Sequence, residues 1–357
     1  NTEYFNDVKD LKTELGINMI INPEYATAVE ISRLLRFPSA ANIDAFRRGQ
    51  VELVGFHTRK GEILNGRALS ELASSIRRLP ILFCAVERDG HVIIPDGSFI
   101  IQEGDKVYVI GQPSDINQFF KQLHRESQKI RTVFIVGGGR IAYYLISILR
   151  DFDVDVKVVE RNEDRCRQLA EDFPKCLVIH GDGTDPELLS QEHVTASGAF
   201  VALTDRDEDN LIISLYAIQN GVSKVVAKSN RQNYFGIANS AGLESLVSPK
   251  LITANQILKV VRGMQNSKGS VMTSLYRIAD GHAEAMEFIV GSNTRHLGTP
   301  LKDLKLKKGI LIALIARGNS IIIPEGSSSI QEHDTVFIVS RDHAILDIND
   351  IYDESFG

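Results

Sequence analysis

The sequence predicts an α/β protein: a Rossmann-like doubly wound parallel sheet, joined to two small α+β modules in a tandem repeat. Three observations lead to this fold class. The stretch from Arg131 to Glu160 has the strand–glycine turn–helix–strand–acid order of a dinucleotide-binding unit. Short apolar runs alternate with helical patterns between residues 132 and 247. A block of about 20 residues that contains Ile-Ile-Pro occurs twice.

Composition narrows the class of protein. The chain has 357 residues, 43% of them hydrophobic, which is enough for two or three domains. The net charge of −6 gives no basic surface for nucleic acid, so we expect no nucleic-acid partner. The three cysteines form no CxxC pair, and no histidines have the spacing of metal ligands, so no metal site is expected. No apolar run approaches the roughly 20 residues of a membrane span, and we expect a cytoplasmic protein.

The internal repeat extends over most of the chain. His91–Gly111 matches Ser320–Ser340, and Pro95 and Pro324 in these blocks are 229 positions apart. Asn22–Arg36 matches Ser248–Arg262, with their first residues 226 positions apart. Matching blocks in the same order at nearly one offset indicate a tandem duplication.

The phase of the repeat predicts how the domains are divided. Residue 1 corresponds to about residue 227, so most of a first nucleotide-binding domain is expected upstream in the parent protein. Residues 1–46 are then the tail of that truncated domain with its crossover helix, and residues 47–127 form the first small C-terminal module. Residues 128–266 form the second Rossmann-like domain with its crossover helix, and residues 267–357 form the second small module.

Within the Rossmann-like part, strands are predicted at 132–137, 154–159, 176–180, 198–203, 223–228 and 244–247. The turn Gly137–Gly139 joins the first strand to a helix over Ile141–Leu149. Gly137 permits the tight turn, and Gly139 allows the backbone to approach a pyrophosphate at the helix N-terminus. Glu160 ends the second strand and can accept hydrogen bonds from ribose hydroxyls.

Further candidate ligand residues follow the other strands, because ligands of doubly wound sheets bind beyond the carboxyl ends of the strands. Arg140 can reach phosphate oxygens, and Arg161 can stack on adenine. Asp182 either accepts from the adenine amino group or caps a helix entry. Thr204 and Asp205 follow the fourth strand. Lys228 either meets terminal phosphates or is solvated.

The acidic run from Asp205 to Asp209 allows a metal site or a helix N-terminus, where acidic side chains are favoured by the helix dipole. We favour the helix N-terminus. No catalytic set accompanies the glycine turn, and the sequence has no GxSxG or GxxxxGK[ST] motif. A duplicated nucleotide sensor therefore fits the sequence better than an enzyme.

The quoted segments resemble a known family. GGGRIAYYLISIL, VVERNEDRC, VIHGDGTDPELL, ALTDRDEDNLI and VVAKSNR together resemble the nucleotide-binding domain of regulators of potassium conductance. The two IIP[DE]G blocks resemble the C-terminal modules of that family, and their tandem order resembles the regulatory subunits of Trk potassium-uptake systems. The resemblance implies NAD(H) or ATP/ADP as ligands, held by these residues: Gly137, Gly139, Arg140, Ile141, Glu160, Arg161, Asp182, Thr204 and Asp205.

The resemblance also implies a partner and a location. It implies a non-enzymatic regulator that gates a membrane-embedded potassium transporter subunit, self-associates as a homodimer or ring-like homotetramer, and lies on the inner face of the cell membrane. Two alternatives stay open: a regulator of a different ion transporter, and an NAD-dependent oxidoreductase. The apolar stripe over Pro249–Arg262 is expected to contact a neighbouring subunit, and Gly263–Gly269 is a candidate hinge.

Overall fold

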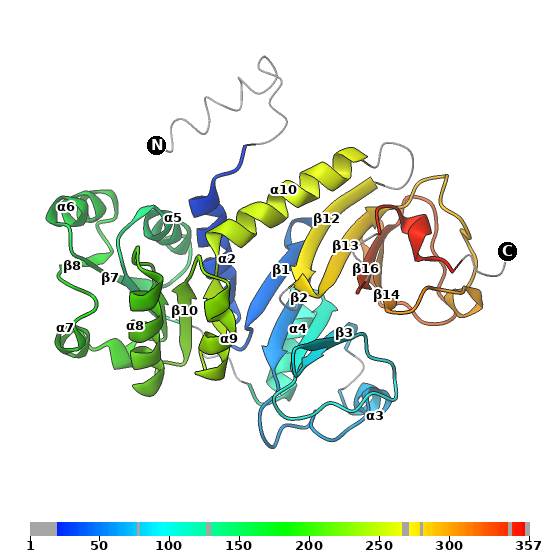
Figure 1. Cartoon of the computed structure of the whole chain (residues 1–357), viewed down its shortest axis with the longest axis horizontal. Coiled ribbons are helices and arrows are strands. Elements are labelled where there is room, and N and C mark those ends of the chain that lie inside the picture. The colour runs from blue at the N-terminus through cyan, green and yellow to red at the C-terminus, as the bar shows by residue number, and fades with distance from the viewer. Residues whose placement is uncertain are drawn as a thin grey trace, which may run out of the picture.

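The structure, a computed structural model, describes residues 20–76, 79–125, 130–265, 271–278, 281–341 and 345–353. Three sheets form the framework of these residues. In Figure 1 a helix-covered parallel sheet lies on one side and two antiparallel sheets lie on the other. The long helices α2 (Pro23–Arg36) and α10 (Pro249–Gln265) run between them. This arrangement confirms the predicted fold class.

The parallel sheet has six strands in the order β11-β10-β9-β6-β7-β8. They are β6 (Thr132–Val136), β7 (Asp155–Glu160), β8 (Leu177–His180), β9 (Ala199–Ala202), β10 (Lys224–Lys228) and β11 (Ser245–Val247). Its helices are α5 (Arg140–Leu149), α6 (Glu163–Asp172), α7 (Pro186–Gln191), α8 (Asp207–Gln219) and α9 (Asn233–Ser240). Each predicted strand overlaps one of these strands. Because the order runs outward from β6 in one direction and from β9 in the other, the switch point lies between these two strands.

Each small module contains a five-stranded antiparallel sheet, and both sheets have the same strand order. The first comprises β1 (Asn42–Phe46), β2 (Val51–His57), β3 (Ile81–Arg88), β4 (His91–Ile93) and β5 (Lys106–Gly111), with helices α3 (Leu69–Ser75) and α4 (Pro113–Gln122). The second comprises β12 (Val271–Ile278), β13 (Ala283–Ile289), β14 (Ile310–Arg317), β15 (Ser320–Ile322) and β16 (Thr335–Ser340). The register shifts between Phe83 and Ala85 on β3 and between Ile312 and Leu314 on β14, again 229 positions apart. The three-dimensional structure thus repeats as the sequence does.

An ion pair between a partly exposed arginine and a buried aspartate is also duplicated. Arg88 donates two hydrogen bonds to Asp105 at 2.7 and 2.6 Å, and Arg317 donates two to Asp334 at 2.9 and 2.8 Å. Both aspartate side chains are only 1% exposed. Each also accepts from the amide of the residue three positions earlier, at 2.8 Å. The pair therefore fixes a β-hairpin strand to the turn that precedes the central strand of each module.

The two modules pack against each other through one face of each sheet. The Phe46 ring centroid lies 4.7 Å from that of Tyr276 and 5.3 Å from that of Phe337. The Tyr276 hydroxyl donates to the backbone carbonyl of Ala45 at 2.7 Å. Small buried residues such as Ala285 and Ala313 allow close approach of the sheets. Burial of each large side chain here stabilises the fold by roughly 1.5–3 kcal/mol, so the sheet pair is a major source of stability.

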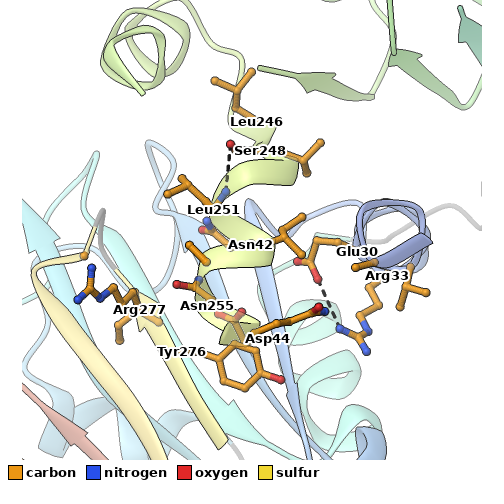
Figure 2. Close-up of a pocket in the computed structure, with 18 of the residues that line it drawn as sticks. Glu30, Arg33, Asn42, Asp44, Leu246, Ser248, Leu251, Asn255, Tyr276 and Arg277 are labelled. Atoms are coloured by element: carbon orange, nitrogen blue, oxygen red, sulfur yellow. Dashed lines mark hydrogen bonds and ion pairs between the residues drawn. The ribbon is translucent and has the colours of Figure 1, made fainter. Parts of the chain in front are cut away.

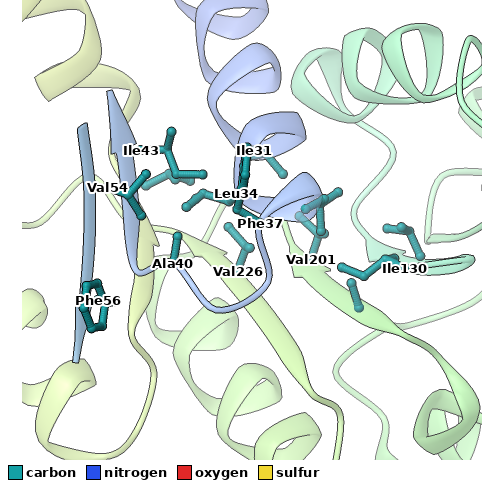
Figure 3. Close-up of a cluster of buried hydrophobic side chains, with 14 of the residues drawn as sticks. Ile31, Leu34, Phe37, Ala40, Ile43, Val54, Phe56, Ile130, Val201 and Val226 are labelled. Carbon is teal, nitrogen blue, oxygen red and sulfur yellow. The ribbon is translucent and has the colours of Figure 1, made fainter. Parts of the chain in front are cut away.

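Helix α2 joins the first module to the parallel sheet. Figure 3 shows Ile31 and Leu34 of α2 in one buried cluster with Ile43 of β1 and with Val201 and Val226 of the parallel sheet. All five side chains are at most 2% exposed. A substitution that opens this cluster therefore disturbs both parts of the chain.

Both crossover helices begin at the predicted proline turns. Asn22 caps α2 by accepting from the amide of Tyr25 at 2.9 Å, and Pro23 occupies the first turn. Helix α10 begins at Pro249 after Ser248. Among the described residues, no helix has the length and apolar character needed to cross a membrane.

The predicted domain boundaries stay predictions. The boundaries at 127/128 and 266/267 fall at residues 126–129 and 266–270, which lie outside the described residues. Most of the candidate hinge over Gly263–Gly269 lies outside them as well.

Candidate nucleotide-binding site

The glycine turn lies at the switch point of the parallel sheet. Gly137 has a φ of +97°, and a Cβ there would lie 2.8 Å from the backbone carbon and oxygen of Leu203. Only glycine fits this position. Gly139 is the N-cap of α5, and no atom of the residues that the structure describes lies within 4 Å of the place that its Cβ would take. Among the described residues no side chain caps α5, so its first amides are available to an anion.

Glu160, at the end of β7, contacts the glycine turn directly. Its carboxylate accepts from the amide of Gly138 at 2.6 Å and from the amide of Asn162 at 2.8 Å. An ionised carboxylate has about four lone-pair sites, so it can accept further hydrogen bonds from ribose hydroxyls. Glu160 thus positions the turn as well as presenting an acceptor.

The turn after β8 uses Asp182 as a local cap. Its carboxylate accepts from the amide and the hydroxyl of Thr184 at 2.9 and 2.7 Å. These hydrogen bonds lower the pKa of Asp182, and the charge of Arg161 lowers it further. Asp185, the N-cap of α7, accepts from the amide of Glu187 at 2.9 Å. The structure therefore shows the capping role of Asp182, while contact with adenine stays a prediction.

Asn210 links the ends of β9 and β10 and is not among the site residues that the sequence predicts. It is fully buried on α8, and its oxygen accepts from the amide and hydroxyl of Thr204, both at 2.8 Å. Its nitrogen donates to the carbonyl oxygens of Thr204 at 3.1 Å and Lys228 at 3.0 Å. Lys228 is itself buried, which argues against the solvated alternative. The one sequence signal for Asn210 is its position: a side-chain amide one turn into a helix that directly follows a strand.

The remaining predicted residues surround this centre. Arg140 is exposed and lies 3.0 Å from the carboxylate of Glu24 on α2. An exposed pair of this kind contributes about 0–1 kcal/mol, so a phosphate group can compete for Arg140. Ile141 is half-buried behind it, and Asp205 and Arg161 are exposed.

The acidic run forms the start of α8, as favoured above. Asp207 is buried and accepts from the amides of Asn230 at 2.8 Å and Arg231 at 3.1 Å. Glu208 pairs with the Arg231 guanidinium at 2.9 Å. Within the described part of the chain, no group of three or more His, Cys, Asp or Glu side chains is placed to hold a metal ion. The run therefore ties α8 to the loop after β10.

Arg165 is a second residue that the sequence did not reveal. It lies on α6, and its Nε donates to the carbonyl oxygen of Gly138 at 2.6 Å, with a longer contact of 3.4 Å to that of Gly139. Its guanidinium lies 5.5 Å from the ring centroid of Tyr143 on α5. Glu160 and Arg165 thus hold Gly138 by its amide and by its carbonyl, which orients the peptide units of the turn.

Replacing Arg165 with methionine should weaken ADP binding about tenfold and leave adenosine binding unchanged. A hydrogen bond to a charged group contributes about 1.5–3 kcal/mol, and this one orients the amides that face phosphate, which adenosine lacks. Titration calorimetry with both ligands measures the difference. Arg167→Met is the matched control, because Arg167 lies on the exposed face of the same helix and pairs with Glu163. Equal losses for ADP and adenosine would contradict the role.

Together these features define a class of protein: a Rossmann-type domain, with an open glycine turn and a terminal acid, joined to duplicated antiparallel modules. The TrkA-N domain family model matches residues 133–249, and the TrkA-C domain model matches residues 53–124 and 285–352. The chain belongs to the TrkA family, which confirms the family expected from the sequence.

Relatives match nearly the whole chain. The "Trk system potassium uptake protein TrkA homolog 2" of Methanosarcina mazei is 30% identical over 99% of this chain and 77% of its own length. The "Trk system potassium uptake protein TrkA" of Haemophilus influenzae is 30% identical over 96% of this chain and 74% of its own length.

Solved structures share the fold. The GsuK RCK domain has a TM-score of 0.51 and 17% identity over 93% of this chain and 70% of that chain. The GsuK channel bound to NAD has a TM-score of 0.51 and 18% identity over 93% of this chain and 58% of that chain. At these identities the likeness concerns the fold alone.

Proposed function

We propose that the chain is a nucleotide-binding regulatory subunit that gates a membrane potassium uptake transporter. Membership of the TrkA family supports the transport part, since relatives from two organisms are named as Trk potassium uptake proteins. One observation carries the nucleotide part: the uncapped N-terminus of α5 opens beside Gly139, with the Glu160 carboxylate held against the same turn. The helix N-terminus can bind the phosphate groups of a nucleotide, and the carboxylate can accept hydrogen bonds from its ribose.

The ligands that fit are NAD(H) and adenine nucleotides such as ATP and ADP. All of them carry a ribose for Glu160 and phosphates for the α5 amides, so this geometry does not rank them. The GsuK channel, which shares the fold, was solved with NAD. The residues proposed to hold the nucleotide are Gly137, Gly139, Arg140, Ile141, Glu160, Arg161, Asp182, Thr204, Asp205 and Lys228.

Regulation requires that the nucleotide bind two conformations with unequal affinity. We propose that the difference reaches a membrane-embedded transporter subunit, with the protein attached to the inner face of the cell membrane as a homodimer or homotetramer and acting without catalysis of its own. Coupling is then reciprocal, so transporter binding changes nucleotide affinity by the same factor.

Helix α10 supports a role in assembly, although only part of its apolar stripe is exposed for contact with a second subunit. Leu258 packs against the core of the second module, and Leu251 and Ile252 line a cavity between α2 and α10. Ile257 and Val261 are 47% and 44% exposed and can contact a second subunit. The intermolecular contact proposed for this helix therefore rests on Ile257 and Val261, not on the whole stripe.

Replacing Glu160 with alanine should shift the nucleotide dependence of potassium flux to higher concentration, by about tenfold for the lost ribose and turn contacts. The measurement is flux in vesicles that contain the transporter and the purified subunit. Glu171→Ala is the control, because Glu171 is an exposed carboxylate on α6. A normal nucleotide response of Glu160→Ala would contradict the assignment of this site as the sensor.

The same vesicles separate the alternatives. A nucleotide-dependent flux of sodium but not potassium would favour a regulator of a different transporter. Consumption of NADH with a carbonyl substrate, in the absence of any membrane partner, would favour an oxidoreductase.

A further inference from the structure

A large cavity lies between the two repeats, away from the glycine turn. Its volume is about 950 Å³, and its walls come from α2, β1, α9, α10 and β12 (Figure 2). Small-molecule sites in proteins commonly measure about 300–1,000 Å³. Neither Gly139 nor Glu160 lines it, so it is separate from the proposed nucleotide site.

The cavity lies where equivalent positions of the duplication meet. Glu30 of α2 corresponds to Gln256 of α10, 226 positions later, and Asp44 of β1 corresponds to Tyr276 of β12, 232 positions later. All four residues line the cavity. The first repeat therefore supplies two carboxyl groups, and the second supplies a neutral amide and a phenol at the matching positions.

The two carboxyl groups differ in their partners. Glu30 pairs with Arg33 at 3.4 Å, which Figure 2 marks with a dashed line. Asp44 makes no hydrogen bond or ion pair with any residue that the structure describes, although Arg33 and Lys106 act on it at longer range. Burial, followed by the charge of Glu30, raises the pKa of Asp44 well above its usual value. Burial likewise raises the pKa of Glu30 to about 7.

The half-buried Asp44 carboxyl group has no cation in direct contact among the described residues, so a cation placed beside it would stabilise its ionised form. Two guanidinium groups also line the cavity, and each already has an acidic partner: Arg33 pairs with Glu30 at 3.4 Å, and Arg277 pairs with Glu284 at 3.5 Å. The lining also contains the aromatic rings of Tyr25 and Tyr276 and an apolar wall of Leu251 and Ile252, which suit an organic cation better than a bare ion. A single metal ion would leave most of the volume unfilled.

We propose that this cavity is a second ligand site, which binds a small organic amine with its ammonium group on Asp44 and Glu30 and its carbon chain on the α10 wall. Because the walls belong to both repeats, an occupied cavity favours one relative arrangement of the repeats over others. The amine is in this way a second input to the regulator, independent of the nucleotide.

The test uses the full chain, with putrescine, cadaverine and benzylamine as probes and with 1,5-pentanediol and benzyl alcohol as neutral counterparts. Calorimetry and thermal melting at pH 8 should show binding of at least one amine and of neither alcohol. Asp44→Asn should weaken amine binding about tenfold or more, since it removes one ion pair and keeps the shape. Asp151→Asn, an exposed aspartate, should not change it.

Two further readouts keep the proposal falsifiable. Asp44→Asn should melt no lower than the parent protein at pH 8, because an acid with a raised folded-state pKa destabilises the fold at a pH above its unfolded value. Its affinity for ADP should also stay unchanged, which separates this site from the nucleotide site. The proposal is overturned if no amine binds, if amines bind Asp44→Asn as tightly as the parent, or if calcium or magnesium chloride binds at Asp44 and the amines do not.

Discussion

Replacing Gly139 with valine should abolish nucleotide binding while the protein stays folded. The valine side chain would enter the space in front of α5, where no atom of the described part of the chain lies within 4 Å of the added Cβ. Gly139 has a φ of −66°, which any residue adopts, so the backbone is not strained. The added carbon atoms occupy the space that a pyrophosphate needs to reach the helix amides. Calorimetry with ADP and NADH should show at least about a hundredfold loss, or roughly 2.7 kcal/mol.

Gly137→Ala provides the contrasting variant in the same turn. Its Cβ would lie 2.8 Å from the backbone of Leu203, at a φ of +97°, so we expect a loss of about 2–4 kcal/mol in the free energy of unfolding. Melting temperatures of the two variants should therefore differ clearly, with Gly139→Val close to the parent. Retained ADP binding in a folded Gly139→Val protein would refute the site.

The second large effect concerns the duplicated ion pair. Asp334→Ala should lower the free energy of unfolding by about 3 kcal/mol, because it removes the acceptor of two Arg317 hydrogen bonds and of one backbone amide, and leaves Arg317 with the Ser329 carbonyl. Asp105→Ala should cost a similar amount through Arg88. Urea unfolding measures both losses, and Glu332→Ala, an exposed carboxylate two residues from Asp334, should stay within about 0.5 kcal/mol of the parent.

Unequal losses would also be informative. If Asp105→Ala lowers the free energy of unfolding little while Asp334→Ala lowers it by about 3 kcal/mol, the ion pair stabilises the second module more than the first. Negligible losses in both would show that the hydrogen-bonded geometry adds nothing to stability, contrary to our expectation.

The sequence predicted the sheet well because the signals for its strands are local. Val133–Val136 is β-branched and apolar, and Gly137 follows it where only a residue without a side chain fits. The proline turns at Pro23 and Pro249 marked both crossover helices for the same reason. The repeat made the small modules recognisable, since each block confirmed the other.

Parts of the site were not predictable in this way. Asn210 donates a hydrogen bond to the carbonyl of Lys228, and Arg165 donates one to the carbonyl of Gly138. Both contacts depend on how helices α6 and α8 pack on the sheet, which the sequence pattern does not give. The inter-repeat cavity depends on the placement of α2 beside α10, which no local pattern records. The proposed ligand contacts of Arg161 and Asp205 stay predictions, because both side chains are exposed.

The sheet-on-sheet contact between the modules should persist when the protein is diluted. A contact between separate chains dissociates when the protein concentration falls below its dissociation constant. Here both partners belong to one polypeptide, so the contact of Phe46 with Tyr276 and Phe337 is intramolecular and does not depend on the protein concentration. The pairing persists in a cell that holds only a few copies of the protein. Each half is also free to acquire different residues at matching positions, which an identical pair of subunits cannot do.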